Sequence, residues 1–281
     1  MLRESDTPIV FVGGSLRGIN ANWLRRIECS PPIREGDLSK LLQHSPRRRV
    51  LILDGVFSEN QAVTPTECRT LMRSGWSLFG ASSMGALRAA DLWPEGMVGI
   101  GDVFLAYRTG LLKSDADVAV ALDPSTYEEI TVNIPFLRAA LADLLTRGVI
   151  DAVKGRKMLN VVAKVHFLER TPEVCRDEWV AANFAEDAWR PALDFITVPA
   201  NNPKVRDAYL ALAHLLSPMW AGVHERDRRL PHMDFREARD DGKPCAETIP
   251  GKWRICPACA YRMPSNAIFC PECASTAHEN Q

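Results

Sequence analysis

Four cysteines near the end of the chain have the spacing of a zinc site. Cys256 and Cys259 form one Cys-x-x-Cys pair, and after ten intervening residues Cys270 and Cys273 form another. Four thiolates can surround one zinc ion tetrahedrally, and such a site is structural because no position is left open for water. The segment is too short to bury a core, so metal binding must supply its folding free energy. Two disulfides are the alternative, which the lack of an export signal disfavours.

Ser83 lies in a turn that could make its hydroxyl a nucleophile. The apolar run 76–79 leads into Gly-Ala-Ser-Ser-Met-Gly at 80–85 and then into a strongly helical segment. Small residues on both sides suit a sharp strand–nucleophile–helix turn. Free N–H groups at the helix N-terminus would stabilise developing negative charge, so we expect the Met84 N–H and the loop around Gly14 to bind the oxyanion. The alternative is a serine that merely caps a helix.

Two further polar residues are candidate substrate-binding groups. Asp54 follows the apolar run 50–53, near where a ligand crevice should lie, and Arg88 sits about a turn and a half into the helix after Ser83. Capping is the alternative role for Asp54, and pairing with Asp91 is the alternative for Arg88. The nearby Gly13-Gly14-Ser15 lacks the residues of a P-loop and the spacing of a dinucleotide fingerprint, so a nucleotide site is not expected.

These residues must be held by an alternating pattern of strands and helices. Short apolar runs bounded by Gly or Asp are typical of buried strands, and they occur at 9–12, 50–53, 76–79 and 97–100, with a weaker one at 118–122. Helix signals lie between them, the clearest being the capping box Thr64-Pro-Thr-Glu67. The pattern predicts an α/β fold with a mainly parallel sheet and flanking helices.

The second half of the chain is predicted to be helical. One helix should run from Asn133 to Arg147 and another from Asp151 to Arg170, and two more should begin at Thr171-Pro172 and Asn202-Pro203. We therefore predict three parts: an α/β body at 1–220 that becomes helical after about 130, a charged loop or linker at 221–251, and a small C-terminal zinc ribbon at 252–275.

Composition excludes several classes of protein. The 281 residues carry a formal net charge of −1 with a pI of about 6.6, which gives no general affinity for polyanions or membranes. No apolar stretch approaches the ~20 residues that a membrane helix needs. We expect a soluble cytoplasmic protein that does not bind nucleic acid.

Several motifs together resemble the TfuA family, which is named from trifolitoxin production. They are Val-Phe-Val-Gly-Gly-Ser-Leu at 10–16, Pro-Pro-Ile-Arg-Glu-Gly-Asp at 31–37, Leu-Asp-Gly-Val-Phe at 53–57, Gly-Ala-Ser-Ser-Met-Gly-Ala-Leu-Arg-Ala-Ala-Asp-Leu at 80–92, Gly-Met-Val-Gly-Ile-Gly at 96–101 and Asp-Ala-Asp-Val-Ala-Val at 115–120. The resemblance covers roughly residues 8–172, and its serine-containing run is long and specific.

The resemblance implies a function in peptide backbone thioamidation. Members of the family accompany YcaO enzymes, which activate a peptide amide with ATP so that sulfur can replace its oxygen. By resemblance, the protein hydrolyses the C-terminal thiocarboxylate of a ThiS-like sulfur carrier, releases sulfide and helps YcaO to engage its peptide. The family site uses a Ser–Lys pair, and Ser83 falls on the serine of the motif.

We assign the lysine of the pair to Lys164. At helical spacing its neighbours are Asn160, Val161, Phe167 and Leu168, and an apolar setting would favour the neutral amine that a base requires. The alternative is that Lys154, Lys157 and Lys164 form one solvated helix face.

Two other functions remain open. The protein could be a non-catalytic adaptor that binds YcaO, the carrier or the precursor peptide, with the ribbon as a docking module. It could also be an esterase-like hydrolase of small thioesters, although the chain offers no convincing acid–histidine partner for that chemistry.

Overall fold

The computed structural model describes residues 7–16, 21–57, 61–123, 128–217, 253–255 and 262–264. The chain divides into two compact units, Met1–Gly222 and Val223–Gln281. In the second unit the described residues are two paired antiparallel strands, β6 (Trp253–Ile255) and β7 (Arg262–Pro264). The four cysteines predicted to bind zinc lie outside the described residues.

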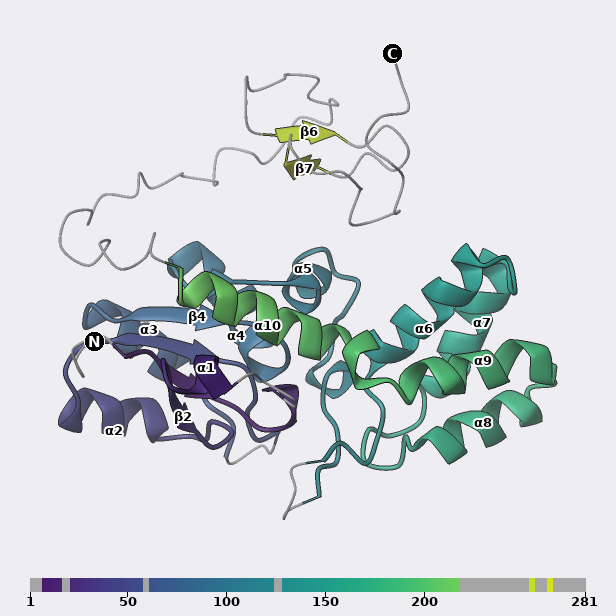
Figure 1. Ribbon diagram of the computed structural model, residues 1–281, viewed down its shortest axis with the longest axis horizontal. Coiled ribbons are helices and arrows are strands. Elements are labelled where there is room, and N and C mark those ends of the chain that lie inside the picture. The colour runs from purple at the N-terminus through teal and green to yellow at the C-terminus, as the bar shows by residue number, and fades with distance from the viewer. Residues whose placement is uncertain are drawn as a thin grey trace. The chain divides into compact units, whose positions relative to one another are not determined.

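The first unit is built on a five-stranded parallel sheet with the strand order β2-β1-β3-β4-β5 (Figure 1). The strands are β1 (Ile9–Phe11), β2 (Glu28–Ser30), β3 (Arg49–Ile52), β4 (Ser77–Gly80) and β5 (Val98–Gly99). All four neighbouring pairs are parallel. The central strands β1 and β3 are buried along their whole length, as expected for apolar runs covered on both faces. The α/β prediction is therefore confirmed.

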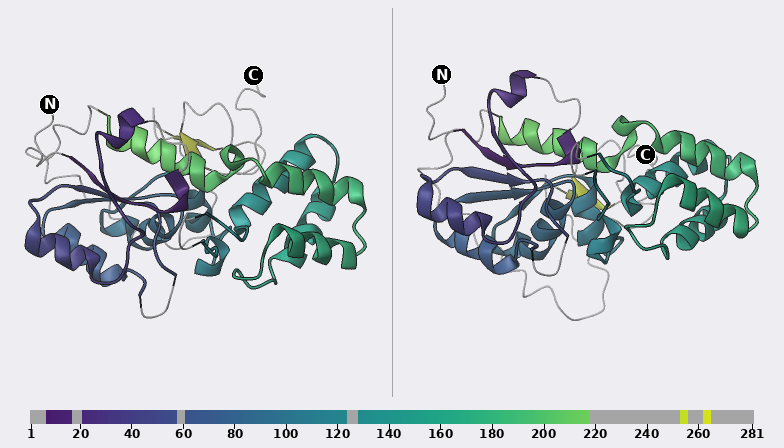
Figure 2. Two further views of the ribbon diagram at one scale, coloured as in Figure 1. Left: turned by 60° about the horizontal axis from the view of Figure 1, so that its bottom comes forward. Right: turned by 90° about the horizontal axis from the view of Figure 1, so that it is seen from below.

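Helices cover both faces of this sheet, as the views in Figure 2 show. On one face α10 (Pro203–Leu215) packs against Leu51 of β3 and against Leu53, which directly follows that strand. On the other face Val50 and Ile52 meet a layer of three helices, namely α2 (Asp37–His44), α3 (Pro65–Arg73) and α4 (Met84–Leu92). The alternation follows from the two-residue period of a strand.

A helical part follows the sheet and has a core of its own. Its helices are α6 (Ile134–Thr146), α7 (Ala152–Val162), α8 (Pro172–Ala181) and α9 (Glu186–Ile196). Trp179 is fully buried at its centre, and the indole N–H donates a hydrogen bond to the Met158 carbonyl oxygen at 2.9 Å. The remaining short elements are α1 (Ala21–Leu24), α5 (Asp102–Arg108) and the 3-10 turns η2 (Gly14–Leu16), η3 (Trp93–Glu95), η4 (Asp115–Asp117) and η5 (Pro199–Asn201).

The predicted helix starts are confirmed by the capping contacts. Thr64 and Glu67 form the capping box that begins α3. The side chains of Asn133, Thr171 and Asn202 each accept a backbone N–H from the first turn of the helix that follows.

Two predictions about the elements were wrong, and one strand was missed. The run 118–122 is not a strand: Val118 is buried in the helical core after η4, and only Leu122 makes an isolated bridge, to Glu129. The helix predicted for 151–170 ends at Val162, and beyond it the Arg170 guanidinium donates hydrogen bonds to the Val165 and Val132 carbonyl oxygens. The edge strand β2 was not predicted, because its exposed residues have no apolar run.

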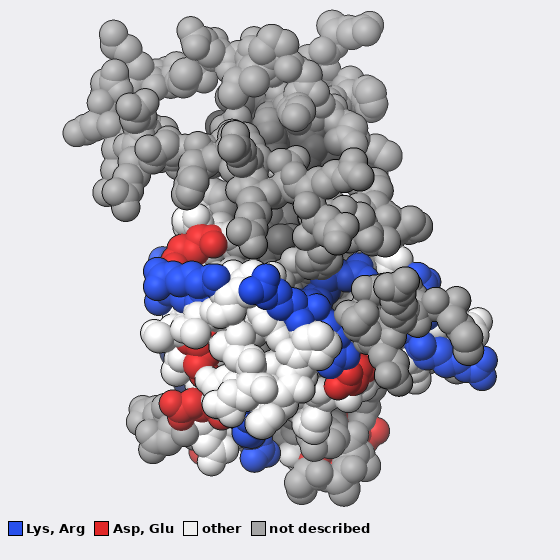
Figure 3. Space-filling model, turned by 90° about the vertical axis from the view of Figure 1, so that its left-hand side faces the viewer, with Lys and Arg blue, Asp and Glu red and all other residues white. Residues whose placement is uncertain are grey.

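The amino-terminal edge of the sheet carries charges of both signs. In Figure 3, lysine and arginine side chains are spread among acidic and uncharged ones. Two arginines here satisfy carbonyl groups at the end of α10: Arg49 donates to the Leu215 oxygen at 2.6 Å and Arg26 to the Leu216 oxygen at 3.0 Å. Within the described ranges, no helix is long and apolar enough to cross a membrane.

Helix α4 packs so closely on the sheet that a side chain at position 85 should have no room. A Cβ there would lie 1.8 Å from the Ile52 carbonyl oxygen, a backbone atom that cannot move aside. We expect Gly85→Ala to lower the free energy of unfolding by about 3 kcal/mol or more, measured by urea denaturation. The matched control is Gly155→Ala in α7, whose Cβ has room and should add about 0.5–1 kcal/mol. Equal effects of the two substitutions would contradict the packing described.

The contact between α10 and α5 should make stability depend on pH. Asp207 accepts the Asp102 and Val103 N–H groups at the start of α5, at 2.9 and 2.8 Å. Burial raises the pKa of Asp207 from 3.8 to about 7, although these hydrogen bonds oppose the shift. The folded state therefore binds the proton of the Asp207 carboxyl group more tightly than the unfolded chain does. The stability that this proton contributes is lost as the pH rises toward about 7.

Asp207→Asn should remove this part of the pH dependence. We expect urea midpoints of the wild type to fall more steeply than those of Asp207→Asn as the pH rises from about 4 to about 7. If the urea midpoints of the two proteins change with pH in parallel, the raised pKa of Asp207 does not contribute to the pH dependence of stability.

Candidate functional site

The candidate site lies at the carboxyl ends of β1, β3 and β4. From β1 the chain passes to β2 on one side and then to β3 on the other, so the crevice between β1 and β3 is a topological switch point. Ligands of open parallel sheets bind in such crevices. The residues that follow the three strands here include Ser15, Asp54 and Ser83.

Asp54 ties the loop after β1 to the end of β3. One carboxylate oxygen accepts the Gly13 N–H at 2.8 Å and the Ser15 N–H at 3.0 Å, and the other accepts the Ser15 hydroxyl at 2.6 Å. The carboxylate thus accepts the N–H groups of a glycine-containing loop, as a phosphate does in a phosphate-binding loop. These contacts are the ones expected from the capping alternative for Asp54.

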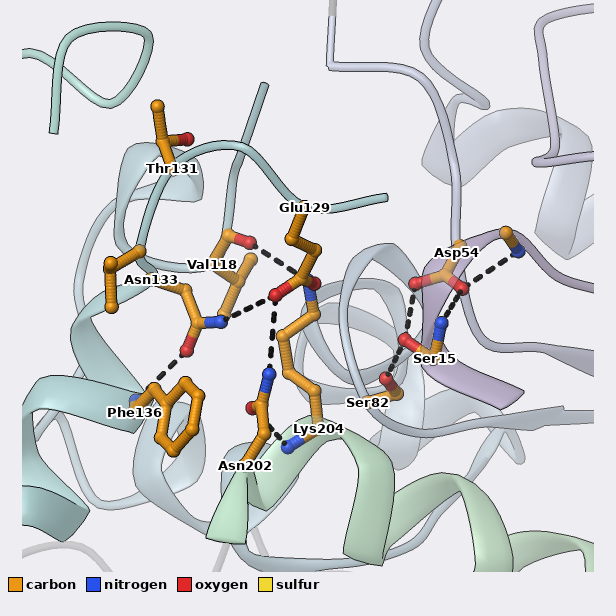
Figure 4. A network of polar contacts seen from close by, with 12 residues as sticks. Ser15, Asp54, Ser82, Val118, Glu129, Thr131, Asn133, Phe136, Asn202 and Lys204 are labelled. Carbon is orange, nitrogen blue, oxygen red and sulfur yellow. Dashed lines mark hydrogen bonds and ion pairs between the residues drawn. The ribbon is translucent and has the colours of Figure 1, made fainter. Parts of the chain in front are cut away.

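Ser82 has the strained backbone expected of the turn. Its φ is +68°, a conformation that costs about 1–2 kcal/mol for residues other than glycine. The side chain is fully buried, and its hydroxyl donates to the Ser15 hydroxyl at 2.6 Å. Figure 4 shows Ser15 between Ser82 and Asp54. The sequence predicted a sharp turn with Ser83 as its nucleophile, and the residue with positive φ is the preceding one, Ser82.

Ser83 directly precedes the first residue of α4. It is 3% exposed, and its backbone has φ −119° and ψ −111°. Its hydroxyl makes no side-chain cap, and within the described residues no lysine nitrogen hydrogen-bonds to it. Among the residues that the structure describes, the N–H groups of Met84 and Gly14 donate to no acceptor. Both predicted oxyanion donors are therefore unoccupied, whereas the Gly13 and Ser15 N–H groups bind Asp54.

A pocket of about 420 Å³ lies beside this turn. It is lined by Phe57, Ala62, Met84, Leu87, Arg88, Asp115, Ala116, Ala119 and Phe167. The Arg88 Nε donates to the Val63 carbonyl oxygen at 2.8 Å, and Nη1 donates to Asp91 at 3.1 Å. Arg88 thus lines the pocket as a substrate-binding residue would, and it also makes the alternative pair with Asp91.

Lys164 is not among the residues that line this pocket, and within the described residues it makes no hydrogen bond to Ser83. It follows the end of α7, and Phe167, three residues later, is a pocket wall. Its side chain is exposed, so the desolvation that we expected around it is not present in the free protein. The single helix face predicted for Lys154, Lys157 and Lys164 is also wrong, because α7 ends before Lys164.

The sequence did not reveal a buried polar cluster around Lys204. Lys204 is 2% exposed, and its Nζ donates to Glu129 at 2.6 Å. The other oxygen of Glu129 accepts the side-chain amides of Asn133 and Asn202, which cap α6 and α10. Figure 4 shows Lys204 directed at Glu129. The only sequence signal was Asn202-Pro203, which predicted a helix start and not a buried charge.

The described residues contain no group of three or more metal-binding side chains, and the cysteines of the predicted ribbon lie outside them. No curated protein matches the chain. Residues 54–171 match the family model described as TfuA-like protein. The matched segment includes β4, the Ser83 turn, α4 and Lys164. This part of the chain is therefore similar to TfuA-like proteins.

Proposed function

We propose that the protein is a TfuA-like accessory of YcaO-dependent peptide backbone thioamidation that hydrolyses the thiocarboxylate of a ThiS-like sulfur carrier. The observation that carries the proposal is the β4–α4 turn inside the matched segment. There a serine hydroxyl without a capping contact precedes a helix whose first N–H group, on Met84, has no backbone acceptor within the described ranges. A nucleophile beside unoccupied donors is the arrangement that acyl transfer requires.

The chemistry proceeds in two steps. The Ser83 oxygen attacks the thiocarboxylate carbon, and the Met84 and Gly14 N–H groups stabilise the resulting oxyanion. The proton taken from Ser83 passes to the sulfur, the carbon–sulfur bond breaks, hydrosulfide leaves, and the carrier remains as an ester of Ser83. Water then attacks the ester carbon, which returns the serine hydroxyl and leaves a carboxylate on the carrier. The positive end of α4 favours both negatively charged intermediates.

We propose Lys164 as the base that accepts the serine proton. A base must be neutral, and burial favours the neutral form of a lysine. In the free protein the side chain is exposed, so the carrier must supply the desolvation when it covers the pocket beside Phe167. This assigns proton transfer to the complex with the carrier and not to the free protein.

Replacing Ser83 tests the nucleophile directly. Ser83→Ala should abolish sulfide release from a thiocarboxylated carrier, because no acyl ester can form; the assay follows sulfide after mixing the purified proteins. The matched control is Ser77→Ala, which removes a serine at the amino end of the same strand, β4, and should keep the wild-type rate. Wild-type release by Ser83→Ala would remove the catalytic proposal.

Lysine variants test the base in the same assay. Lys164→Ala should lower kcat by about 10²–10⁴-fold, the usual contribution of a general base. Lys157→Ala, an exposed lysine within α7, should leave the rate unchanged. If both variants keep the wild-type rate, Lys164 is not the base.

A non-catalytic adaptor is the second candidate function. It is favoured by the exposure of Lys164 and by the absence of a lysine contact to the Ser83 hydroxyl among the described residues. An adaptor would stimulate YcaO equally well with Ser83→Ala as with the wild type, whereas the hydrolase would not.

We also propose that Cys256, Cys259, Cys270 and Cys273 hold one structural zinc ion, on the ground of their donor set and spacing. Metal analysis of freshly reduced protein should then find one zinc per chain. Cys259→Ser should lower this content while the sheet and helices of the first unit stay folded, as judged by circular dichroism. A zinc content near zero in the wild type would reject the ribbon.

A further inference from the structure

Ser82 is held in a conformation that a serine does not prefer. Among the described residues, only Ser82 and Asn183 have positive φ without being glycine. Asn183 follows the end of α8, where asparagine tolerates this geometry. Ser82 instead sits fully buried in the middle of the candidate site. Strain of this kind persists only where the surroundings enforce it.

Two short hydrogen bonds in sequence hold Ser82 in this conformation. The Ser82 hydroxyl donates to Ser15 at 2.6 Å, and the Ser15 hydroxyl donates to Asp54 at 2.6 Å. The Gly13 and Ser15 N–H groups fix the Asp54 carboxylate in turn. All three side chains are buried, so water cannot readily replace these contacts. The chain joins the ends of β4, β1 and β3.

The backbone of Ser82 determines where the reacting groups lie. The next residue, Ser83, donates its N–H to the Leu53 carbonyl oxygen at 3.1 Å, and Met84 begins α4 with an N–H that has no partner in the described part of the chain. A right-handed φ at Ser82 would turn these peptide groups away from the sheet edge. The hydroxyl chain therefore acts on the chemistry through the backbone, without touching the substrate.

The geometry points to Ser15 and Asp54 as positioning residues, which hold Ser82 in its left-handed conformation and thereby aim the Ser83 hydroxyl and the Met84 N–H. This inference rests on the proposed function for its catalytic consequence. The hydrogen-bonded chain from Ser82 through Ser15 to Asp54, here called the clamp, is a property of the fold. Its effect can be measured without the carrier.

Replacing Ser82 with glycine distinguishes a role in positioning the backbone from a role of the hydroxyl in proton transfer. Glycine adopts positive φ without strain, so Ser82→Gly keeps the conformation without the clamp, whereas Ser82→Ala loses the clamp and keeps the strain. We expect Ser82→Gly to be the more active of the two and to unfold at the higher urea concentration. If the hydroxyl acted instead by passing a proton, both variants would lose activity equally.

The decisive comparison is Ser15→Ala with serine or glycine at position 82. With serine, Ser15→Ala should lower kcat by about 10²-fold, the usual result of a misplaced reacting group, with little change in KM. With glycine, the same substitution should have a several-fold smaller effect. Asp54→Asn should lower kcat in the same way as Ser15→Ala, and Ser77→Ala is the unaffected control. An equal Ser15→Ala effect in both backgrounds would overturn the inference.

Two readouts keep this test separate from the proposed function. The first is the rate at which a fluorophosphonate labels Ser83, located by peptide mass spectrometry, and the second is the urea midpoint. If the wild type releases no sulfide but Ser15→Ala slows labelling only with serine at position 82, the proposed function fails and the positioning role stands. If Ser15→Ala changes the labelling rate and the urea midpoint equally with serine and with glycine at position 82, the positioning role fails.

Discussion

The candidate site depends on the Asp54 carboxylate. This group follows β3, the central strand, and binds two N–H groups and one hydroxyl of the loop after β1. Hydrogen bonds to an ionised acceptor are stronger than neutral ones, and burial strengthens them further. Through Ser15 the same carboxylate reaches Ser82 after β4. One acidic side chain therefore fixes the three strand ends from which the proposed reaction centre is built.

The close contact of α4 with the sheet is the second constraint on this turn. A Cβ at Gly80 would lie 2.1 Å from the Gly85 carbonyl oxygen, so both glycines are needed for the helix to start where it does. The buried turn leaves the Met84 N–H without an acceptor among the described residues. An unpaired buried donor is costly for stability. This cost is reasonable at a site where the donor binds a transient negative charge.

Much of the fold could be predicted from the sequence because local signals and burial agreed. The apolar runs at 9–12, 50–53, 76–79 and 97–100 all correspond to strands, and the caps at Thr64 and Asn133 begin helices. The failures have physical causes. The run 118–122 is apolar because Val118 fills the helical core from a loop, and periodicity alone does not separate the two cases.

The site was predicted only in part. The turn around Ser83 has a local signature, so its place before α4 followed from the sequence. The contacts of Ser82, Ser15 and Asp54 join positions up to 67 residues apart, and the Lys204–Glu129 pair joins positions 75 apart. No local pattern indicates such pairs. The exposure of Lys164 was missed because the helix expected to bury it ends at Val162.

The central claim is that Ser83 forms an ester with the sulfur carrier. Its most direct test is to mix the protein with a thiocarboxylated carrier, quench within the first turnovers and analyse the digested peptides by mass spectrometry. The account predicts the C-terminal acyl group of the carrier on the peptide that contains Ser83, attached at position 83 and absent from Ser83→Ala. Release of sulfide with no acyl group on that peptide, or with the group on Ser82, would contradict it.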